Sequence, residues 1–177
     1  MDIIDLLTND HSEVNQLFGR FSQSSKAETQ ADLAKDIIHE LSVHAAVEEQ
    51  FVYPLVRAKV DGGDGMVDHG VEEHQEVKRL LADIEKLDAG SAEFTSKMDK
   101  VISSVREHVE EEEGDVLPKL RESTSAETRE KLGSVVESAK KVVPTHPHPL
   151  VPGTATAQLI AGPWAAMVDK ARDVLAS

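Results

Sequence analysis

The chain has 177 residues and no cysteine, and its 33 acidic against 19 basic residues give a formal net charge of −14. The absence of cysteine excludes disulfides, thiolate metal sites and cysteine nucleophiles, and the acidic balance argues against nucleic acid or an anionic membrane as a partner. Because the chain begins without the basic start of a signal peptide and no apolar run approaches the ~18 residues of a membrane span, we expect a cytoplasmic protein.

Four amphipathic helices are predicted along the first two thirds of the chain, since apolar residues recur there at steps of three and four. Their expected ranges are residues 2–22, 28–52, 66–87 and 92–117. Residues 61–65 (DGGDG) are expected to form a loop by composition. Short connections make neighbouring helices antiparallel. The predicted fold class is therefore all-α, an antiparallel up-down-up-down four-helix bundle with a C-terminal helical extension.

The bundle is assigned to residues 1–122 and the extension to residues 123–177. In the extension we expect a helix over 125–142, then an extended proline-rich connector over 143–153 (VPTHPHPLVPG). A last amphipathic helix, over about 154–175, holds the only tryptophan, Trp164. It would cover the bundle or a second subunit, so both a monomer and a homodimer are compatible with the sequence.

One motif, His-x-x-x-Glu-Glu-x-x-x-x-Pro, occurs over residues 44–54 and again over 108–118. On a helix, residues four apart lie on the same face, so each copy points an imidazole and a carboxylate in one direction. This pairing suits iron, manganese or zinc rather than calcium. The proline that closes each copy predicts the end or a kink of the helix.

The first and third predicted helices each carry one histidine in the apolar stripe, His11 and His74. The next motif histidine follows after 33 residues in the first half (44 − 11) and after 34 in the second (108 − 74), so a helix–loop–helix unit occurs twice. Two unpaired carboxylates in the interior would be costly, and a pair of metal ions bridged by them would satisfy the whole set. The alternative is that these side chains are solvated or hydrogen-bonded in another helical phase. The six interior candidates are His11, His44, Glu48, His74, His108 and Glu112.

With Asp10 before His11 and Glu73 before His74, these motifs resemble the hemerythrin-like (HHE cation-binding) family over about residues 2–120. The resemblance implies a non-haem centre of two iron ions with an oxo or hydroxo bridge. It also implies the role of each candidate. The terminal ligands would be His11, His44, His74 and His108, and the bridging carboxylates would be Glu48 and Glu112.

The chain departs from the oxygen-carrying hemerythrins, which it otherwise resembles. Those carriers have a fifth histidine four residues from another on the third helix, where this chain has Gly70 and Lys78. They also pair the fourth-helix histidine with an aspartate at another spacing. With one imidazole fewer, the coordination spheres should be more open. Open positions favour chemistry on hydrogen peroxide, oxygen or nitric oxide over oxygen transport.

Tyr53, the only tyrosine, has Leu117 as its counterpart in the second half. A regular helical phase from Glu48 turns it away from the interior, whereas a loosened helix before Pro54 would bring it back. Our hypothesis is that Tyr53 is a metal ligand, or a hydrogen-bond donor beside the metal, in the place of the missing histidine. The alternative is a core residue with its hydroxyl in water.

Other polar candidates rank below these. Glu49 and Glu113 either bind the ligand imidazoles or lie on the polar face, and the polar face is favoured. His39 and His69 each precede a proposed ligand by five residues, on a different face, and are expected to be exposed.

Three functions remain open. The first is an oxidoreductase that decomposes hydrogen peroxide, as a catalase does, or that reacts with oxygen or nitric oxide. The second is an oxygen or iron sensor or carrier without turnover. The third is a helical interaction protein without metal. The ligand types alone are equally compatible with zinc or manganese.

Overall fold

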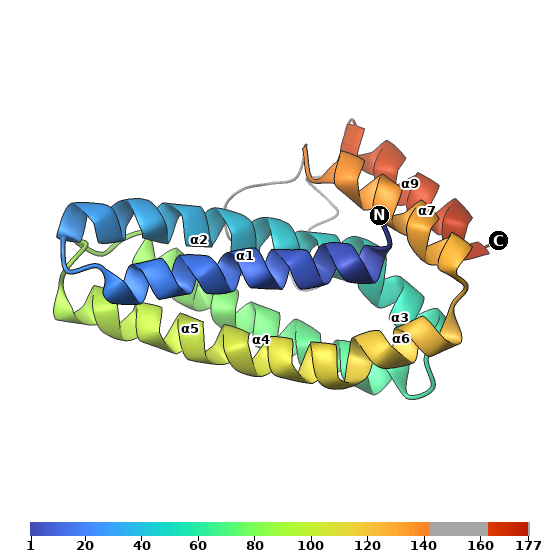
Figure 1. Cartoon of the computed structure of the whole chain (residues 1–177), viewed down its shortest axis with the longest axis horizontal. Helices are drawn as coiled ribbons and strands as arrows, with labels where there is room; N and C mark the ends of the chain where they lie inside the picture. The colour runs from blue at the N-terminus through green and yellow to red at the C-terminus, as the bar shows by residue number, and fades with distance from the viewer. Residues whose placement is uncertain (142–162, 177) are drawn as a thin grey trace.

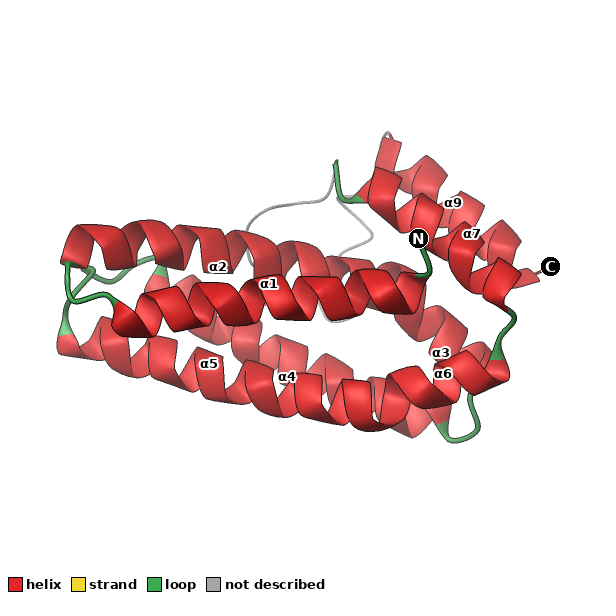
Figure 2. Cartoon of the chain, viewed as in Figure 1, coloured by secondary structure: helices red, strands yellow, loops and turns green. Residues whose placement is uncertain are grey.

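The chain, as a computed structural model that describes residues 1–141 and 163–176, contains only helices as regular elements in those ranges (Figures 1 and 2). Four long helices lie side by side as an antiparallel bundle: α1 (Ile3–Gln23), α2 (Ala27–Val47), α4 (Gly63–Ile84) and α5 (Ala92–Glu111). The predicted all-α bundle with a helical extension is confirmed. Every described helix is too short or too polar to form a bilayer span.

Side-chain caps fix the starts of two bundle helices. The Asp2 carboxylate accepts a hydrogen bond from the Ile4 amide at 2.9 Å, and the Ser91 hydroxyl accepts one from the Phe94 amide at 3.2 Å. Each cap supplies an acceptor for an amide that has no partner within the helix. The sequence therefore sets where α1 and α5 begin.

The glycine-rich stretch before α4 is shorter as a loop than expected. Helix α4 begins at Gly63 rather than at residue 66, directly after Gly62, which has φ +73° and ends the turn. A Cβ at Gly63 would lie 2.3 Å from the carbonyl oxygen of Val56. These glycines allow a tight reversal of the chain and a close approach of two backbones, rather than a long loop.

Two π-helical turns interrupt the second and fourth predicted helices. They span Glu48–Val52 and Glu112–Val116 and lead into α3 (Tyr53–Lys59) and α6 (Leu117–Ser123). The amide of Tyr53 donates to the carbonyl of Glu48, five residues back, and that of Leu117 donates to the carbonyl of Glu112. Proline, which has no N–H, follows each of these residues and is tolerated in the first turn of a new helix. The prediction of unbroken α-helices to residues 52 and 117 was wrong in this respect.

The C-terminal extension packs on the end of the bundle at which the N-terminus lies (Figure 1). Its described helices are α7 (Ala126–Ala139) and α9 (Pro163–Ala176). A Cβ at Gly133 of α7 would lie 2.1 Å from the carbonyl oxygen of Met1, so α7 and the N-terminus are in close backbone contact. The predicted connector over 143–153 lies outside the described residues, as does the start of the predicted helix over 154–175.

The apolar core is divided into two clusters. The cap cluster lies where the extension covers the bundle, and its members come from α1, α2, the first π turn, α3, α4, α6, α7 and α9. They include Ile3, Leu7, Val47, Phe51, Leu55, Val67, Leu117, Leu120, Leu132 and Val136. The tip cluster fills the other end, with Val14, Phe18, Phe21, Leu33, Ile37, Leu41, Val77, Leu81, Phe94, Met98, Val101 and Val105 among its members.

Replacing Arg129 of α7 with methionine is expected to destabilise the protein by about 3 kcal/mol, because a buried ion pair loses one partner. The Arg129 guanidinium donates to the Asp2 carboxylate at 2.7 Å and to the carbonyl oxygens of Arg121 and Thr124 at 3.0 and 2.6 Å. Thermal unfolding would measure the loss, expected at about 6–12 °C for a chain of this size. As a control, Arg121→Met, at an exposed side chain, should change the melting temperature little. Equal melting temperatures of the two variants would contradict the role given to Arg129.

Candidate metal centre

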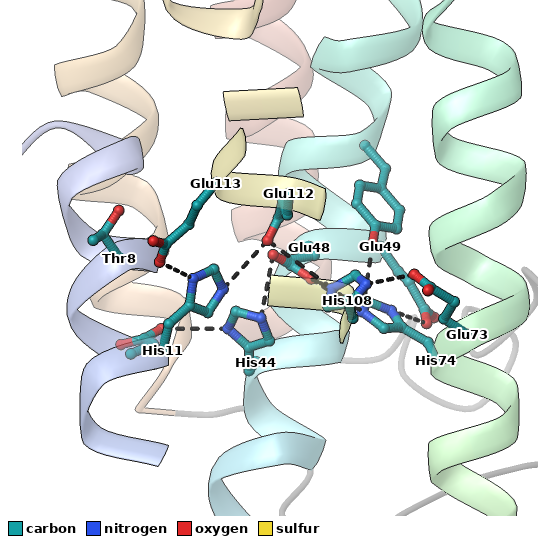
Figure 3. A network of polar contacts seen from close by, with 12 residues as sticks. Thr8, His11, His44, Glu48, Glu49, Glu73, His74, His108, Glu112 and Glu113 are labelled. Carbon is teal, nitrogen blue, oxygen red and sulfur yellow. Dashed lines mark hydrogen bonds and ion pairs between the residues drawn. The ribbon is translucent and has the colours of Figure 1, made fainter. Parts of the chain in front are cut away.

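The six predicted interior residues are all buried and meet in one layer between the cap cluster and the tip cluster. Figure 3 shows two imidazoles on either side of two central carboxylates. Helices α1 and α2 and the first π turn contribute His11, His44 and Glu48, and α4, α5 and the second π turn contribute His74, His108 and Glu112.

The Nε2 atoms of the imidazoles face the central carboxylates. Glu48 is shared, with Oε1 3.2 Å from Nε2 of His44 and Oε2 3.1 Å from Nε2 of His74. Glu112 Oε2 lies 3.2 Å from Nε2 of His11 and 4.0 Å from that of His108. The candidate ligand atoms fall into two groups, each within 4.8 Å, and Glu48 belongs to both: His11, His44, Glu48, Glu112 and Glu48, His74, His108.

A carboxylate stands behind every imidazole, on the Nδ1 side. Three of these contacts are hydrogen bonds: His11 to Glu113 at 2.7 Å, His74 to Glu49 at 3.1 Å and His108 to Glu73 at 2.7 Å. The fourth, His44 to Asp10, measures 3.8 Å, too long for a hydrogen bond. An Nδ1–H that donates outward leaves Nε2 unprotonated and free to bind a cation, which is the usual arrangement of metal-binding histidines.

Six of the eight inner atoms of the layer have no hydrogen-bond partner, whereas Nε2 of His74 and Nε2 of His108 lie 3.3 Å from each other. Both carboxylate oxygens of Glu48 and of Glu112 are buried and unpartnered, as are Nε2 of His11 and Nε2 of His44. Buried polar atoms are rarely left in this state, and unpaired buried carboxylates are costly. Cations between the imidazoles and the carboxylates would satisfy all of them, so the residues fit a two-metal site.

The pKa values of the layer's carboxyl groups and imidazoles also reflect a local excess of negative charge. Burial opposes ionisation of Glu48, yet His44 and the other imidazoles hold its pKa well below the ordinary value. Burial and the charge of Glu48 raise the pKa of Glu112. Burial alone would lower the pKa of His44, but the carboxylates of Glu48 and Asp10 raise it to about 10. In the absence of metal, protons therefore supply the positive charge that balances the carboxylates.

The first π turn brings Tyr53 to the layer, in the way that a loosened helix was expected to. Its side chain is buried, its ring stacks on that of His74 with centroids 5.6 Å apart, and its hydroxyl lies 3.4 Å from Nε2 of His74. A Cβ at position 70 would lie 2.6 Å from this hydroxyl, so Gly70 leaves the space that the Tyr53 hydroxyl occupies. Leu117, at the matching position, belongs to the cap cluster.

The expectation that Glu49 lies on the polar face was wrong, since its side chain is 10% exposed and contacts His74. Glu113 is exposed, as expected, but it also contacts His11. Pro54 and Pro118 indicated a break in each helix, but the hydrogen-bond register of the π turns was not foreseen. The roles of Asp10 and Glu73 behind His44 and His108 were also missed, although each directly precedes a predicted ligand, which was the available signal. Two lysines that pair with the outer carboxylates were missed as well. Lys78 pairs with Glu49 at 2.5 Å, and Lys140 pairs with Asp10. His39 and His69 are exposed, as predicted.

A small cavity adjoins the layer on the side of the tip cluster. Its volume is about 30 Å³, and its lining includes all four imidazoles together with apolar side chains such as Val14, Leu41, Val77 and Val105. A water molecule needs roughly 10–15 Å³ of such space. The cavity therefore admits a molecule of about two non-hydrogen atoms.

Comparisons with known proteins agree with this architecture. Residues 2–120 match the family model of the hemerythrin HHE cation-binding domain. A hemerythrin-like protein of Schizosaccharomyces pombe is 30% identical over 174 residues, which are 98% of this chain and 86% of that protein. A DNA nickase of Nostoc is 30% identical over 143 residues, 81% of this chain but 40% of the nickase.

Among solved structures, the chain is similar to a hemerythrin HHE cation-binding domain-containing protein of Mycobacterium kansasii. The TM-score is 0.70 at 17% identity, with 96% of this chain and 99% of the other covered. At this identity the likeness concerns the fold.

Proposed function

Because the chain belongs to the hemerythrin HHE cation-binding family, and is thus an iron-binding protein, we propose that its buried layer holds two iron ions and reacts with a small oxidant. The substrate we propose first is hydrogen peroxide, decomposed to water and oxygen; oxygen and nitric oxide are alternatives of similar size. A bound iron pair would accept two electrons from one peroxide and return them to a second, so that no external reductant is consumed.

The observation that carries this proposal is the cavity of about 30 Å³ beside the imidazoles. Its size favours a substrate of about two non-hydrogen atoms over larger organic molecules, and its largely apolar lining limits the number of water molecules beside the layer. Peroxide, oxygen and nitric oxide each have two non-hydrogen atoms, so each fits. Selection by size needs few polar recognition groups, and besides the imidazoles only Glu73 and Lys78 supply charged side chains to the largely apolar lining.

The chain's own residues hold and orient the pair. His11, His44, His74 and His108 would bind through Nε2, with Glu48 and Glu112 between them. The outer carboxylates fix each imidazole by accepting from Nδ1–H, and removing such a partner typically weakens metal binding about 10- to 100-fold.

The test begins with the metal content and the ultraviolet–visible spectrum of the purified protein, followed by addition of hydrogen peroxide to the iron-loaded form. We expect two irons per chain and the release of one oxygen for two peroxides consumed. An iron-loaded protein that turns over neither peroxide, oxygen nor nitric oxide would refute the enzymatic proposal.

Tyr53→Phe is expected to lower peroxide turnover by about 100-fold, the lower end of the effects of a positioned proton donor. The variant keeps the ring stacked on His74 and removes only the hydroxyl, which lies 3.4 Å from Nε2 of that histidine. If the phenolate binds iron, a visible charge-transfer band is lost as well. Gly70→Ala, whose new methyl group would collide with the hydroxyl, should give a similar loss. Unchanged turnover and an unchanged spectrum in Tyr53→Phe would remove Tyr53 from the mechanism.

A sensor or carrier without turnover is the second candidate, and one contact favours it. Lys140, directly after α7, pairs with Asp10, which lies 3.8 Å from Nδ1 of His44. A shift of His44 on ligand binding would therefore reach the extension. Reversible oxygenation without consumption of peroxide would support this candidate over the enzyme.

DNA nicking is not proposed for this chain. The nickase shares only 40% of its length with the chain, and a net charge of −14 opposes contact with phosphates.

A further inference from the structure

A second group of metal-binding side chains lies on the surface beside the buried layer. Nε2 of His69 is 3.5 Å from a carboxylate oxygen of Glu73 and 3.3 Å from one of Glu111. The ligand atoms of these three residues lie within 4.8 Å of one another. One imidazole and two carboxylates suit a divalent transition-metal ion.

The surface group is connected to the interior. A cavity of about 10 Å³ has His69, Glu73 and Glu111 in its lining together with Glu112, His108, Gly70 and Tyr53. His69 and Glu111 are half exposed at 52% and 51% of their side-chain surface, whereas Glu112 is 3% exposed. Both oxygens of Glu112 lack a hydrogen-bond partner. The cavity therefore leads from an exposed ligand group to an unpartnered buried carboxylate, and its size suits roughly one water-sized particle.

The matching face of the other half is closed. The two halves align in sequence with an offset of 63 residues on the first helix of each (74 − 11) and 64 on the second (108 − 44). Leu6 is therefore the counterpart of His69, and Val47 is the counterpart of Glu111. Both are buried, at 5% and 0% exposure, in the cap cluster with Val136 and Ala139 of α7. Asp10, the counterpart of Glu73, is bound by Lys140.

This asymmetry separates the surface group from the requirements of the buried layer. The inner ligands and outer carboxylates recur in both halves, but the exposed imidazole and carboxylate occur only on the face that α7 and α9 leave uncovered among the described residues. A structural role would call for them, or for an equivalent, in both halves.

We propose that His69, Glu73 and Glu111 bind a divalent cation at the entrance of the smaller cavity and deliver iron to the buried layer. Glu73 connects the two sites, since one of its oxygens faces His69 and the other accepts from Nδ1 of His108 at 2.7 Å. The inference rests on the proposed two-iron layer, but it concerns the route of loading rather than the reaction.

The test compares loading of the metal-free full-length protein by limiting Co²⁺, followed in the stopped-flow spectrometer through the visible bands of the buried ions. His69→Ala/Glu111→Gln is the test variant and leaves Glu73 in place. His39→Ala/Glu110→Gln is the control, because it removes an exposed imidazole and one exposed negative charge elsewhere on the surface. We expect loading about tenfold slower in the test variant, in the range by which local charge raises the rate of ion capture, with the same final occupancy as the wild type.

A second measurement detects the surface ion directly. In protein whose buried sites are already filled with Zn²⁺, added Mn²⁺ should bind with loss of its free electron paramagnetic resonance signal. This binding should persist in the control and disappear in the test variant. Equal loading rates in the test variant and the control would refute the proposed entry site. Absence of Mn²⁺ binding to the Zn²⁺-filled wild type would refute it as well. Failure of the wild type to hold two buried ions would instead overturn the proposed function, so the two failures are distinguishable.

Discussion

Glu48→Gln is expected to empty the buried layer, lowering the metal content from two ions per chain to less than one after dialysis. Glu48 is the residue that belongs to both ligand groups, with oxygens 3.2 Å from Nε2 of His44 and 3.1 Å from Nε2 of His74. An amide keeps the shape but loses the charge and one acceptor. The affinity should fall by more than the ~100-fold that follows loss of an outer partner. Metal analysis, and competition with a chelator of known affinity, would measure it.

The control for this variant is Glu110→Gln, which removes an exposed carboxylate of α5 and should retain both ions. Circular dichroism should show the same helix content in both variants, because neither changes a residue of the cap cluster or the tip cluster. Retention of two tightly bound ions by Glu48→Gln would show that the shared carboxylate is not a ligand.

Removal of the metal from the wild type is expected to lower the melting temperature by about 10–20 °C. An ion present at a hundred times its dissociation constant stabilises the folded state by ~2.7 kcal/mol, so two ions contribute ~5 kcal/mol. For a chain of this length, 1 kcal/mol shifts the melting temperature by roughly 2–4 °C. The physical source is the set of buried carboxylate and imidazole atoms without hydrogen-bond partners, which ions bound between them would satisfy together.

Calorimetry of chelator-treated protein, before and after addition of Fe²⁺ under nitrogen, would measure this shift. Mg²⁺ is the control, because it prefers oxygen ligands and water to imidazole, and it should restore little of the stability. Coincident unfolding curves of the treated and reloaded protein would mean that the layer is stable without ions and that the ligand assignment fails.

The bundle could be predicted from sequence because its apolar periodicity and its turns agree. The apolar stripe of each of the four segments has a histidine or glutamate at a position expected for an apolar core residue. Because these polar residues recur in both halves of the chain, they indicated a buried layer of metal ligands. His11, His44, His74 and His108 lie where a regular helix puts them, since each precedes the π turn or lies on a helix without one.

The parts that sequence did not reveal follow the π turns. One additional residue in the turn after Glu48 rotates everything beyond it, which brings Glu49 behind His74 and Tyr53 onto His74. Pro54 indicated a break, but a missing N–H does not specify which hydrogen-bond register replaces the regular one. The pairing of Lys140 with Asp10 joins segments 130 residues apart, and no local pattern indicates such a contact.

The division of the core has a consequence for how the molecule unfolds. The layer of imidazoles and carboxylates lies between the cap cluster and the tip cluster, so bound ions would link the two apolar clusters into one cooperative transition. Without ions, hydrogen exchange should resolve two sets of amides with different opening free energies. One set belongs to the half of the bundle around Phe18 and Met98, and the other to the helices around Leu55 and Leu132. In the loaded protein the two sets should merge, so the ions would set the size of the cooperative unit as well as its stability.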